Sequence, residues 1–184
     1  MVHYLSMAYE LHYWPTIQGR GEFVRLALEE AAIPYRDVAR AKGGEDRLVA
    51  ELGNRRLQHP PFAPPFLKAG KLVIGQTANI LLFLGERHGL APKSDAGRLW
   101  THQLQLTIAD LVAEIHDSHH PIAGGLYYED QQKEAAKRAR DLRANRLPKY
   151  LGYFARVLKK NGSGWLVGNR RSYADLSLFQ IVEG

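Results

Sequence analysis

The sequence predicts an α/β domain followed by an all-α domain, and three observations support this. Up to about residue 90, short strand-like runs alternate with helical ones. Beyond residue 97, apolar residues recur almost entirely at helical spacing. Between these parts, 90–96 has the sequence Leu-Ala-Pro-Lys-Ser-Asp-Ala, which is typical of a linker. We therefore expect one domain at 1–90 and an all-helical domain at 97–184.

Composition excludes several classes of protein. The chain has 184 residues, 45% hydrophobic and 24% charged, which is ordinary globular usage. It has no cysteine, so it has no disulfide, no Cys-ligated zinc, no Cys nucleophile and no Cys-x-x-Cys redox pair. No apolar run approaches the roughly 18 residues of a membrane span, and Met1–Leu5 does not resemble a secretory leader. We expect a cytoplasmic protein without a membrane partner.

The first domain begins with a predicted parallel βαβ unit. The aromatic-rich run Tyr9–Trp14 stops at a proline, which indicates a strand, and a turn at Thr16–Gly21 follows. Apolar residues at i, i+3, i+4 and i+8 from Phe23 to Ala31 predict a helix, and Tyr35–Val38 is a second strand. A helix between two strands favours a parallel pair.

The rest of the first domain is predicted to be a hairpin and a helix. Lys42–Arg56 is charged and contains several glycines, so it suits only a short irregular helix. Phe66–Leu67 and Leu72–Ile74 flank a four-residue turn, which predicts the hairpin. The helix begins near Gln76-Thr77 and ends at Gly89.

Three long helices are predicted in the second domain, near Gly97–Ser118, Glu129–Lys160 and from Tyr173 onward. Pro148 must break or kink the second helix, because it lacks an N–H and its ring clashes with the preceding turn. The sequence stops while the third helix is still running, so we expect this domain to be truncated at its C-terminus.

Positive charge is concentrated in one stretch. The net charge is +6, and Lys133–Lys160 holds ten basic residues against two acidic ones. Nucleic-acid binding is one interpretation. The alternative is the solvated face of an amphipathic helix, because apolar residues from Ala135 to Leu158 recur at helical spacing. We favour the second interpretation and expect no nucleic-acid partner.

A histidine cluster, His116-Asp-Ser-His-His120, is a second candidate site. His116 and His120 are one helical turn apart and could face one metal. No Glu completes a His-Glu-x-x-His motif, and Pro121 follows at once. We favour a helix end and expect no metal.

Five ordered motifs resemble the cytosolic glutathione transferases, a family with a thioredoxin-like first domain and an all-helical second one. Each motif alone is weak, but their order along the chain is specific. They are Tyr13-Trp14-Pro15, Gly19-Arg20-Gly21 with Arg25-Leu26, Pro64-Pro65-Phe66-Leu67 through Gly75-Gln76-Thr77, Leu82-Phe83-Leu84-Gly85, and Trp165–Asn169 with Ser172–Leu176.

This resemblance assigns catalysis to Tyr13. The glutathione thiolate is the nucleophile, and lowering a thiol pKa by two units requires about 2.7 kcal/mol of preferential thiolate stabilisation. A hydroxyl that donates a hydrogen bond to sulfur supplies part of it. Tyr9 and Thr16 are competing hydroxyls, and a buried strand aromatic is the structural alternative.

The resemblance also implies a set of glutathione contacts. Pro65 matches a cis proline, which would free the Pro64 carbonyl for the ligand backbone, although Pro64 has no N–H to offer. Gln76 and Thr77 precede a helix, whose N-terminus suits the γ-glutamyl carboxylate. Thr77 could instead be a plain N-cap.

Two further contacts are implied less directly. Arg20 could pair with the glutamyl part of the ligand, although the family pattern places this arginine one residue earlier. Asp110 corresponds to an acidic residue that, in related dimers, reaches the glutathione amine of the neighbouring subunit.

A capping box at Ser172–Asp175 is a structural prediction. We expect the Ser172 hydroxyl to accept from the Asp175 N–H, and the Asp175 carboxylate to accept from the Ser172 N–H. Arg171 stands where the family has an apolar residue.

The resemblance implies a glutathione transferase, with glutathione as co-substrate, an apolar electrophile and a homodimeric assembly. The alternatives are a glutathione-dependent isomerase or peroxidase on the same fold, or a non-enzymatic protein-interaction module.

Overall fold

The first half of the molecule is built on a mixed four-stranded sheet. In the computed structural model, which describes residues 9–183, the strand order is β2-β1-β3-β4. β1 (Tyr9–His12) runs parallel to β2 (Tyr35–Asp37), while β3 (Phe66–Ala69) pairs antiparallel with β1 and with β4 (Leu72–Gly75). The predicted parallel unit and hairpin are both confirmed. Residues 1–5, which do not resemble a secretory leader in sequence, lie outside the described residues.

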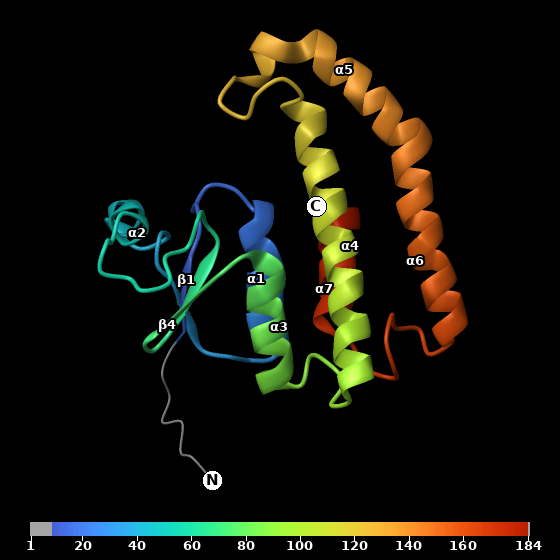
Figure 1. Cartoon of the computed structure of the whole chain (residues 1–184), viewed down its shortest axis with the longest axis horizontal. Coiled ribbons are helices and arrows are strands. Elements are labelled where there is room, and N and C mark those ends of the chain that lie inside the picture. Colours follow the sequence, from blue (N-terminus) through green and yellow to red (C-terminus); the bar gives the residue numbers. More distant parts are fainter. Residues whose placement is uncertain (1–8, 184) are drawn as a thin grey trace.

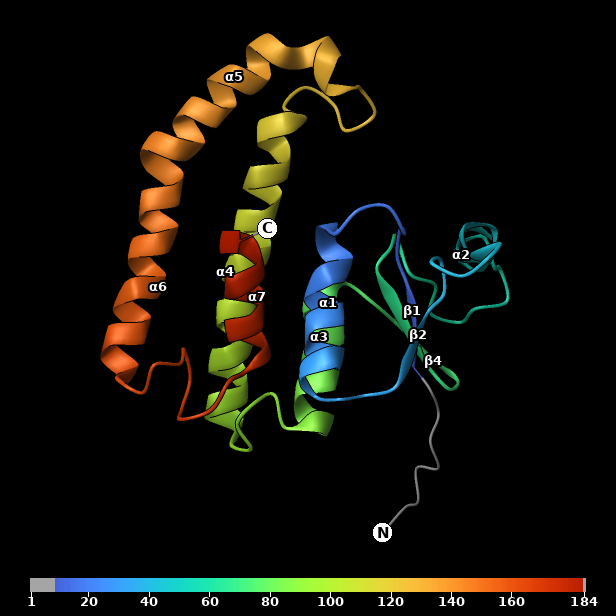
Figure 2. The same ribbon diagram turned by 180° about the vertical axis from the view of Figure 1, so that it is seen from behind.

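Helices cover both faces of this sheet. α1 (Gly19–Glu30) and α3 (Thr77–His88) pack on one face, and α2 (Gly44–Leu52) lies on the other (Figures 1 and 2). α3 ends at Gly89, which has a φ of 75°, as the sequence predicts. This arrangement confirms the predicted thioredoxin-like fold of the first half.

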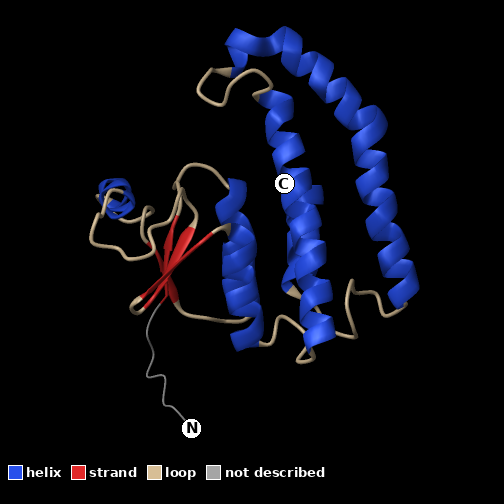
Figure 3. Ribbon diagram, in the orientation of Figure 1, coloured by secondary structure: helices blue, strands red, loops and turns tan. Residues whose placement is uncertain are grey.

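The second half is entirely helical among the described residues (Figure 3). α4 (Asp95–His119) is followed by a short 3₁₀ turn (Tyr128–Gln131) and by α5 (Gln132–Asp141). α6 (Leu147–Asn161) and α7 (Tyr173–Glu183) complete it. Within residues 9–183 no helix is both long and apolar enough to cross a membrane.

A π-helical turn at Leu142–Arg146 joins α5 to α6, immediately before Pro148. The predicted disturbance at this proline therefore takes the form of a wide turn, after which Pro148 stands in the first turn of α6. The two helices form an arch (Figure 1). The apolar residues of α6 do not all turn inward, since Phe154 is buried but Leu151 is 44% exposed.

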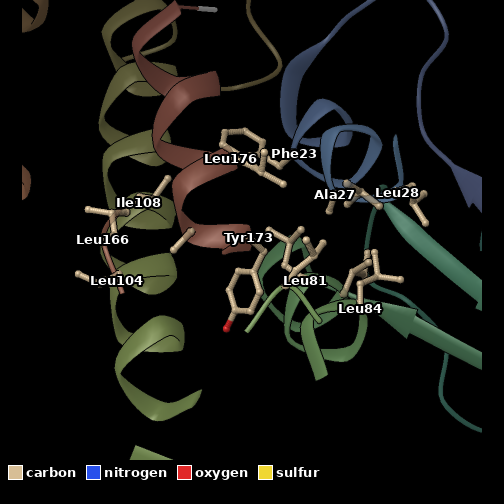
Figure 4. Close-up of a cluster of buried hydrophobic side chains, with 14 of the residues drawn as sticks. Phe23, Ala27, Leu28, Leu81, Leu84, Leu104, Ile108, Leu166, Tyr173 and Leu176 are labelled. Atoms are coloured by element: carbon tan, nitrogen blue, oxygen red, sulfur yellow. The ribbon is translucent and has the colours of Figure 1, made fainter. Parts of the chain in front are cut away.

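One apolar core spans both halves of the chain. α7 packs against α1, α3 and α4, and its Tyr173 is fully buried beside Leu81 (Figure 4). A Cβ at Gly85 of α3 would lie 2.5 Å from the Tyr173 ring, so only glycine permits this approach. The sheet domain and the helical domain therefore share buried side chains.

Asp175 anchors the start of α7. Its carboxylate accepts hydrogen bonds from the backbone N–H of Ser172 (2.8 Å) and of Leu166 (2.7 Å). The Ser172 hydroxyl donates to the same carboxylate (2.6 Å), and the Asp175 N–H goes to the Ser172 carbonyl instead. The predicted bond from the Ser172 N–H to the Asp175 carboxylate is confirmed, and the predicted bond from the Asp175 N–H to the Ser172 hydroxyl was wrong, because this hydroxyl is turned toward the carboxylate as a donor.

Glu114 joins α4 to the α5–α6 arch. Its carboxylate accepts three bonds from Arg146 (2.7, 2.8 and 3.1 Å), one from the Tyr150 hydroxyl (2.9 Å) and a longer one from Arg138 (3.4 Å). The hydrogen bonds from Arg146 lower the pKa of Glu114 from 4.5 to about 2.

We expect this cluster to make the fold acid-sensitive. A carboxyl whose pKa is lower in the folded state contributes stability above pH 4.5 and loses it as pH falls toward 2. Thermal unfolding from pH 6 to pH 2.5 should show a smaller fall in Tm for Glu114→Gln than for the wild type. Replacing the exposed Glu45 by Gln is the control, and equal slopes in all three proteins would contradict the assignment.

Candidate functional site

Tyr13 lies just beyond the end of β1 and is 5% exposed. Its hydroxyl accepts a hydrogen bond from the backbone N–H of Arg20 at 2.9 Å. Cβ atoms at Gly19 and Gly21 would collide with the hydroxyl and the ring of Tyr13, and Gly19 has a φ of 42°. The Gly-Arg-Gly motif is therefore required so that the first turn of α1 can close over this tyrosine.

The competing hydroxyls lie elsewhere. Tyr9 bonds through its hydroxyl to the ring of His88, at the C-terminal end of α3, 2.9 Å away. Thr16 is exposed in the turn. Of the three hydroxyls considered from sequence, the structure brings only that of Tyr13 to the backbone of Arg20.

The N-terminus of α3 meets the N-terminus of α1 at Arg20. The Thr77 hydroxyl donates to the Arg20 carbonyl at 3.4 Å, and Gln76 holds the cap position without a side-chain capping bond. The alternative hypothesis that Thr77 is a plain N-cap was therefore wrong, because Thr77 is the first residue of α3 and Gln76 holds the cap position. Backbone N–H groups in this first turn have no intrahelical partner, which favours an anion.

Gln76 has a backbone conformation that side-chain-bearing residues rarely adopt. Its φ is 66° and its ψ is 118°. Such residues cost of order 1–3 kcal/mol and cluster at ligand sites. The strain turns the chain sharply from β4 into α3 and sets Gln76 at the rim of two cavities.

The first cavity brings together four of the predicted ligand residues. The Pro64–Pro65 peptide is cis, as the resemblance implies. Pro64 lines a cavity of about 690 Å³ together with Arg20, Gln76 and Thr77. The walls come from the proline-rich segment before β3, from β4 and from the starts of α1 and α3. Tyr13 and Asp110 do not line it.

The second cavity, of about 280 Å³, lies between α3 and α4 and shares Arg20, Gln76 and Thr77 with the first. From α4 it receives His102 and Gln105, whose Nδ1 and Oε1 atoms are buried and have no hydrogen-bond partner within the described structure. Gln105 is 2% exposed, and burial lowers the pKa of His102. Both residues therefore line a cavity beside the α3 N-terminus, and each holds one buried polar atom without a partner.

Gln105 and His102 were not predicted from sequence. Asp110 was predicted to reach the ligand of a neighbouring subunit, and that contact stays a prediction. Asp110 is exposed and lines neither cavity, whereas Gln105 lies more than one turn earlier on α4. No local pattern distinguishes these positions, because the packing of α4 against α3 decides which residues face the cavity.

The histidine cluster lies at the end of α4, as expected from Pro121. The rings of His116 and His120 are 5.1 Å apart, and that of His119 tilts against Tyr128. Across residues 9–183 the structure assembles no group of three or more His, Asp or Glu that could hold a metal.

Comparison with known proteins identifies the class. Residues 116–184 match the model of the glutathione S-transferase C-terminal domain. Glutathione S-transferase A4 of Bos taurus is 30% identical over 94% of this chain and 72% of its own length. The glutathione S-transferase of Plasmodium falciparum is 25% identical over 93% of this chain and 77% of its own.

Solved structures share the fold of this chain. The glutathione S-transferase of Ascaris lumbricoides superposes with a TM-score of 0.69 at 27% identity, covering 96% of this chain and 80% of its own. Prostaglandin synthase D of Nilaparvata lugens reaches 0.74 at 21% identity over the same shares of the two chains. The chain belongs to the glutathione S-transferase family.

Proposed function

We propose that the protein is a glutathione transferase that activates the glutathione thiolate for attack on an apolar electrophile. The observation that carries this proposal is the meeting of the α1 and α3 N-termini at one cavity. Arg20, Gln76, Thr77 and the cis Pro64–Pro65 peptide surround it. Its charge, free N–H groups and extended backbone suit a small peptide with a carboxylate at one end.

The γ-glutamyl carboxylate is assigned to the α3 N-terminus, where the unbonded N–H groups, the Thr77 hydroxyl and Arg20 converge. The carbonyl of Pro64 is assigned to the cysteinyl N–H. The adjacent ammonium group is then directed at the unpartnered Oε1 of Gln105, beside His102. The ligand would satisfy polar atoms whose burial without a partner costs free energy.

Tyr13 is assigned to the sulfur. Because its hydroxyl already accepts from the Arg20 N–H, its own proton is free to donate, and the accepted bond polarises the O–H group. The thiol proton is lost to solvent, the thiolate is held by this hydrogen bond, and sulfur then forms a bond to the electrophilic carbon as the leaving group departs.

Replacing Tyr13 by Phe should lower kcat/KM for conjugation of a chromogenic electrophile at least tenfold, because the ring packing is retained while the donor to sulfur is lost. Thermal unfolding checks that the variant folds. A control, Tyr9→Phe, should keep the rate within twofold. An unchanged rate in Tyr13→Phe would remove this tyrosine from the mechanism.

Binding of the ligand ammonium group can be tested with two ligands. Gln105→Leu should weaken glutathione at least fivefold in calorimetry, yet leave an analogue without the α-amine unchanged. Thr77→Ala should weaken both, because both carry the carboxylate. Equal losses for both ligands in Gln105→Leu would indicate a general packing defect, and an absence of glutathione binding in the wild type would refute the proposed function itself.

A homodimer is proposed from the family resemblance and from one exposed ring. Phe62, held between prolines before β3, is 95% exposed and would gain free energy by burial against a second copy. Phe62→Ser should shift sedimentation from dimer to monomer, whereas Leu99→Ser, at an exposed leucine on α4, should not. A monomeric wild type would exclude the assembly.

A cytoplasmic role in detoxification completes the proposal. It is supported by the family to which the chain belongs. Because the chain has no cysteine, the reactive thiol is assigned to the ligand. Imaging of a fluorescent fusion and a panel of electrophiles and hydroperoxides would test location and substrate. Turnover of hydroperoxides alone would favour the peroxidase alternative.

A further inference from the structure

A third cavity, a cationic hollow, lies at the opposite end of α3 from the two cavities at its N-terminus. It has a volume of about 940 Å³ and lies where the α3–α4 connection meets the segment that leads into α7. Both connections run along the same end of the molecule in Figures 1 and 2. At 1.5 Å per residue, the twelve residues of α3 separate this hollow from the cavities at the α3 N-terminus by about 18 Å.

Cationic side chains dominate the lining of this hollow. Glu86 is the single carboxylate among the lining residues that the structure describes, against five cations. These are Arg87, Lys93, Arg98, Arg170 and Arg171. A concave surface lined by one sign of charge focuses the electrostatic potential and attracts counter-ions.

Two of the five cations are already neutralised. Arg98 pairs with Asp95 and, at 3.4 Å, with Glu86. Arg171 donates to Glu30 at 2.8 Å and lies over the ring of Trp165. These ion pairs hold Arg98 and Arg171 in place, and both residues line the hollow.

The other three cations have no carboxylate partner within the described residues. Arg87 lies over the ring of Phe83 at 3.9 Å, which holds its guanidinium in place without neutralising it. Lys93 and Arg170 are exposed and form no ion pair in residues 9–183. These three residues come from three different segments: α3, the linker before α4 and the segment before α7.

We propose that this hollow binds a soluble ligand carrying two or more adjacent phosphate groups, such as a polyphosphate chain or the triphosphate of a nucleotide. One phosphate group would leave cations from the other segments unmatched, whereas a chain of phosphates can meet all three. The arginine guanidinium groups suit bidentate pairing with phosphate oxygens. Because the hollow joins the linker to the α7 segment, the ligand would bridge the two halves of the protein.

Calorimetry and thermal unfolding with inorganic tripolyphosphate in 150 mM salt test this site. The wild type should bind one equivalent of tripolyphosphate, and this binding should raise its Tm. Orthophosphate should bind at least tenfold more weakly than tripolyphosphate. The double variant Lys93→Glu with Arg170→Glu should lose at least tenfold in affinity. The milder pair Lys93→Gln with Arg170→Gln should also weaken binding, which guards against misfolding of the first variant.

The matched control carries the same change of net charge on α5, through Lys133→Glu with Lys137→Glu, at the other end of the molecule. It should bind tripolyphosphate within twofold of the wild type. Equal losses in the two Glu variants, or no binding by the wild type, would overturn the site. Binding of S-hexylglutathione should be unchanged in all variants, so a failure of this proposal is separable from a failure of the proposed function.

Discussion

Burial of α7 between α1, α3 and α4 is the constraint on which the rest of the structure depends. The helix enters the core through Tyr173, which packs against Gly85 of α3. Asp175 fixes its start by binding the backbone of Ser172 and of Leu166. α7 therefore joins the sheet half and the helical half in one continuous core, alongside the direct packing of α4 against α3.

The position of α4 in turn completes the candidate site. α3 is held at both ends: its N-terminus opens into two cavities, and its C-terminus borders the cationic hollow. Because α4 packs along α3, Gln105 and His102 face the same cavity as Thr77. The cavity at the α3 N-terminus is therefore lined by both halves of the chain, with Thr77 from the sheet half and Gln105 and His102 from the helical half.

Local chemistry explains which features could be predicted. Gly89, the hairpin around Gly70 and the parallel strand pair follow from backbone rules that act over a few residues, and each is confirmed. Boundaries were less accurate: β1 ends at His12 rather than at Trp14, because the chain turns there to close α1 over Tyr13. The buried Arg25, which bonds to Asp37 and Glu22, was not anticipated, since a charged residue is buried only when distant partners are present.

The sequence by itself determined the fold class, the order of the elements and the motifs that mark the glutathione transferase family, because hydrophobic period, proline and glycine act locally. Only the tertiary structure decided which side chains meet. It brought Thr77 to the Arg20 carbonyl, left Asp110 outside both cavities and aimed Gln105 into one of them. A helix offers several faces of similar polarity, and the face that turns inward is set by packing against segments far away in the sequence.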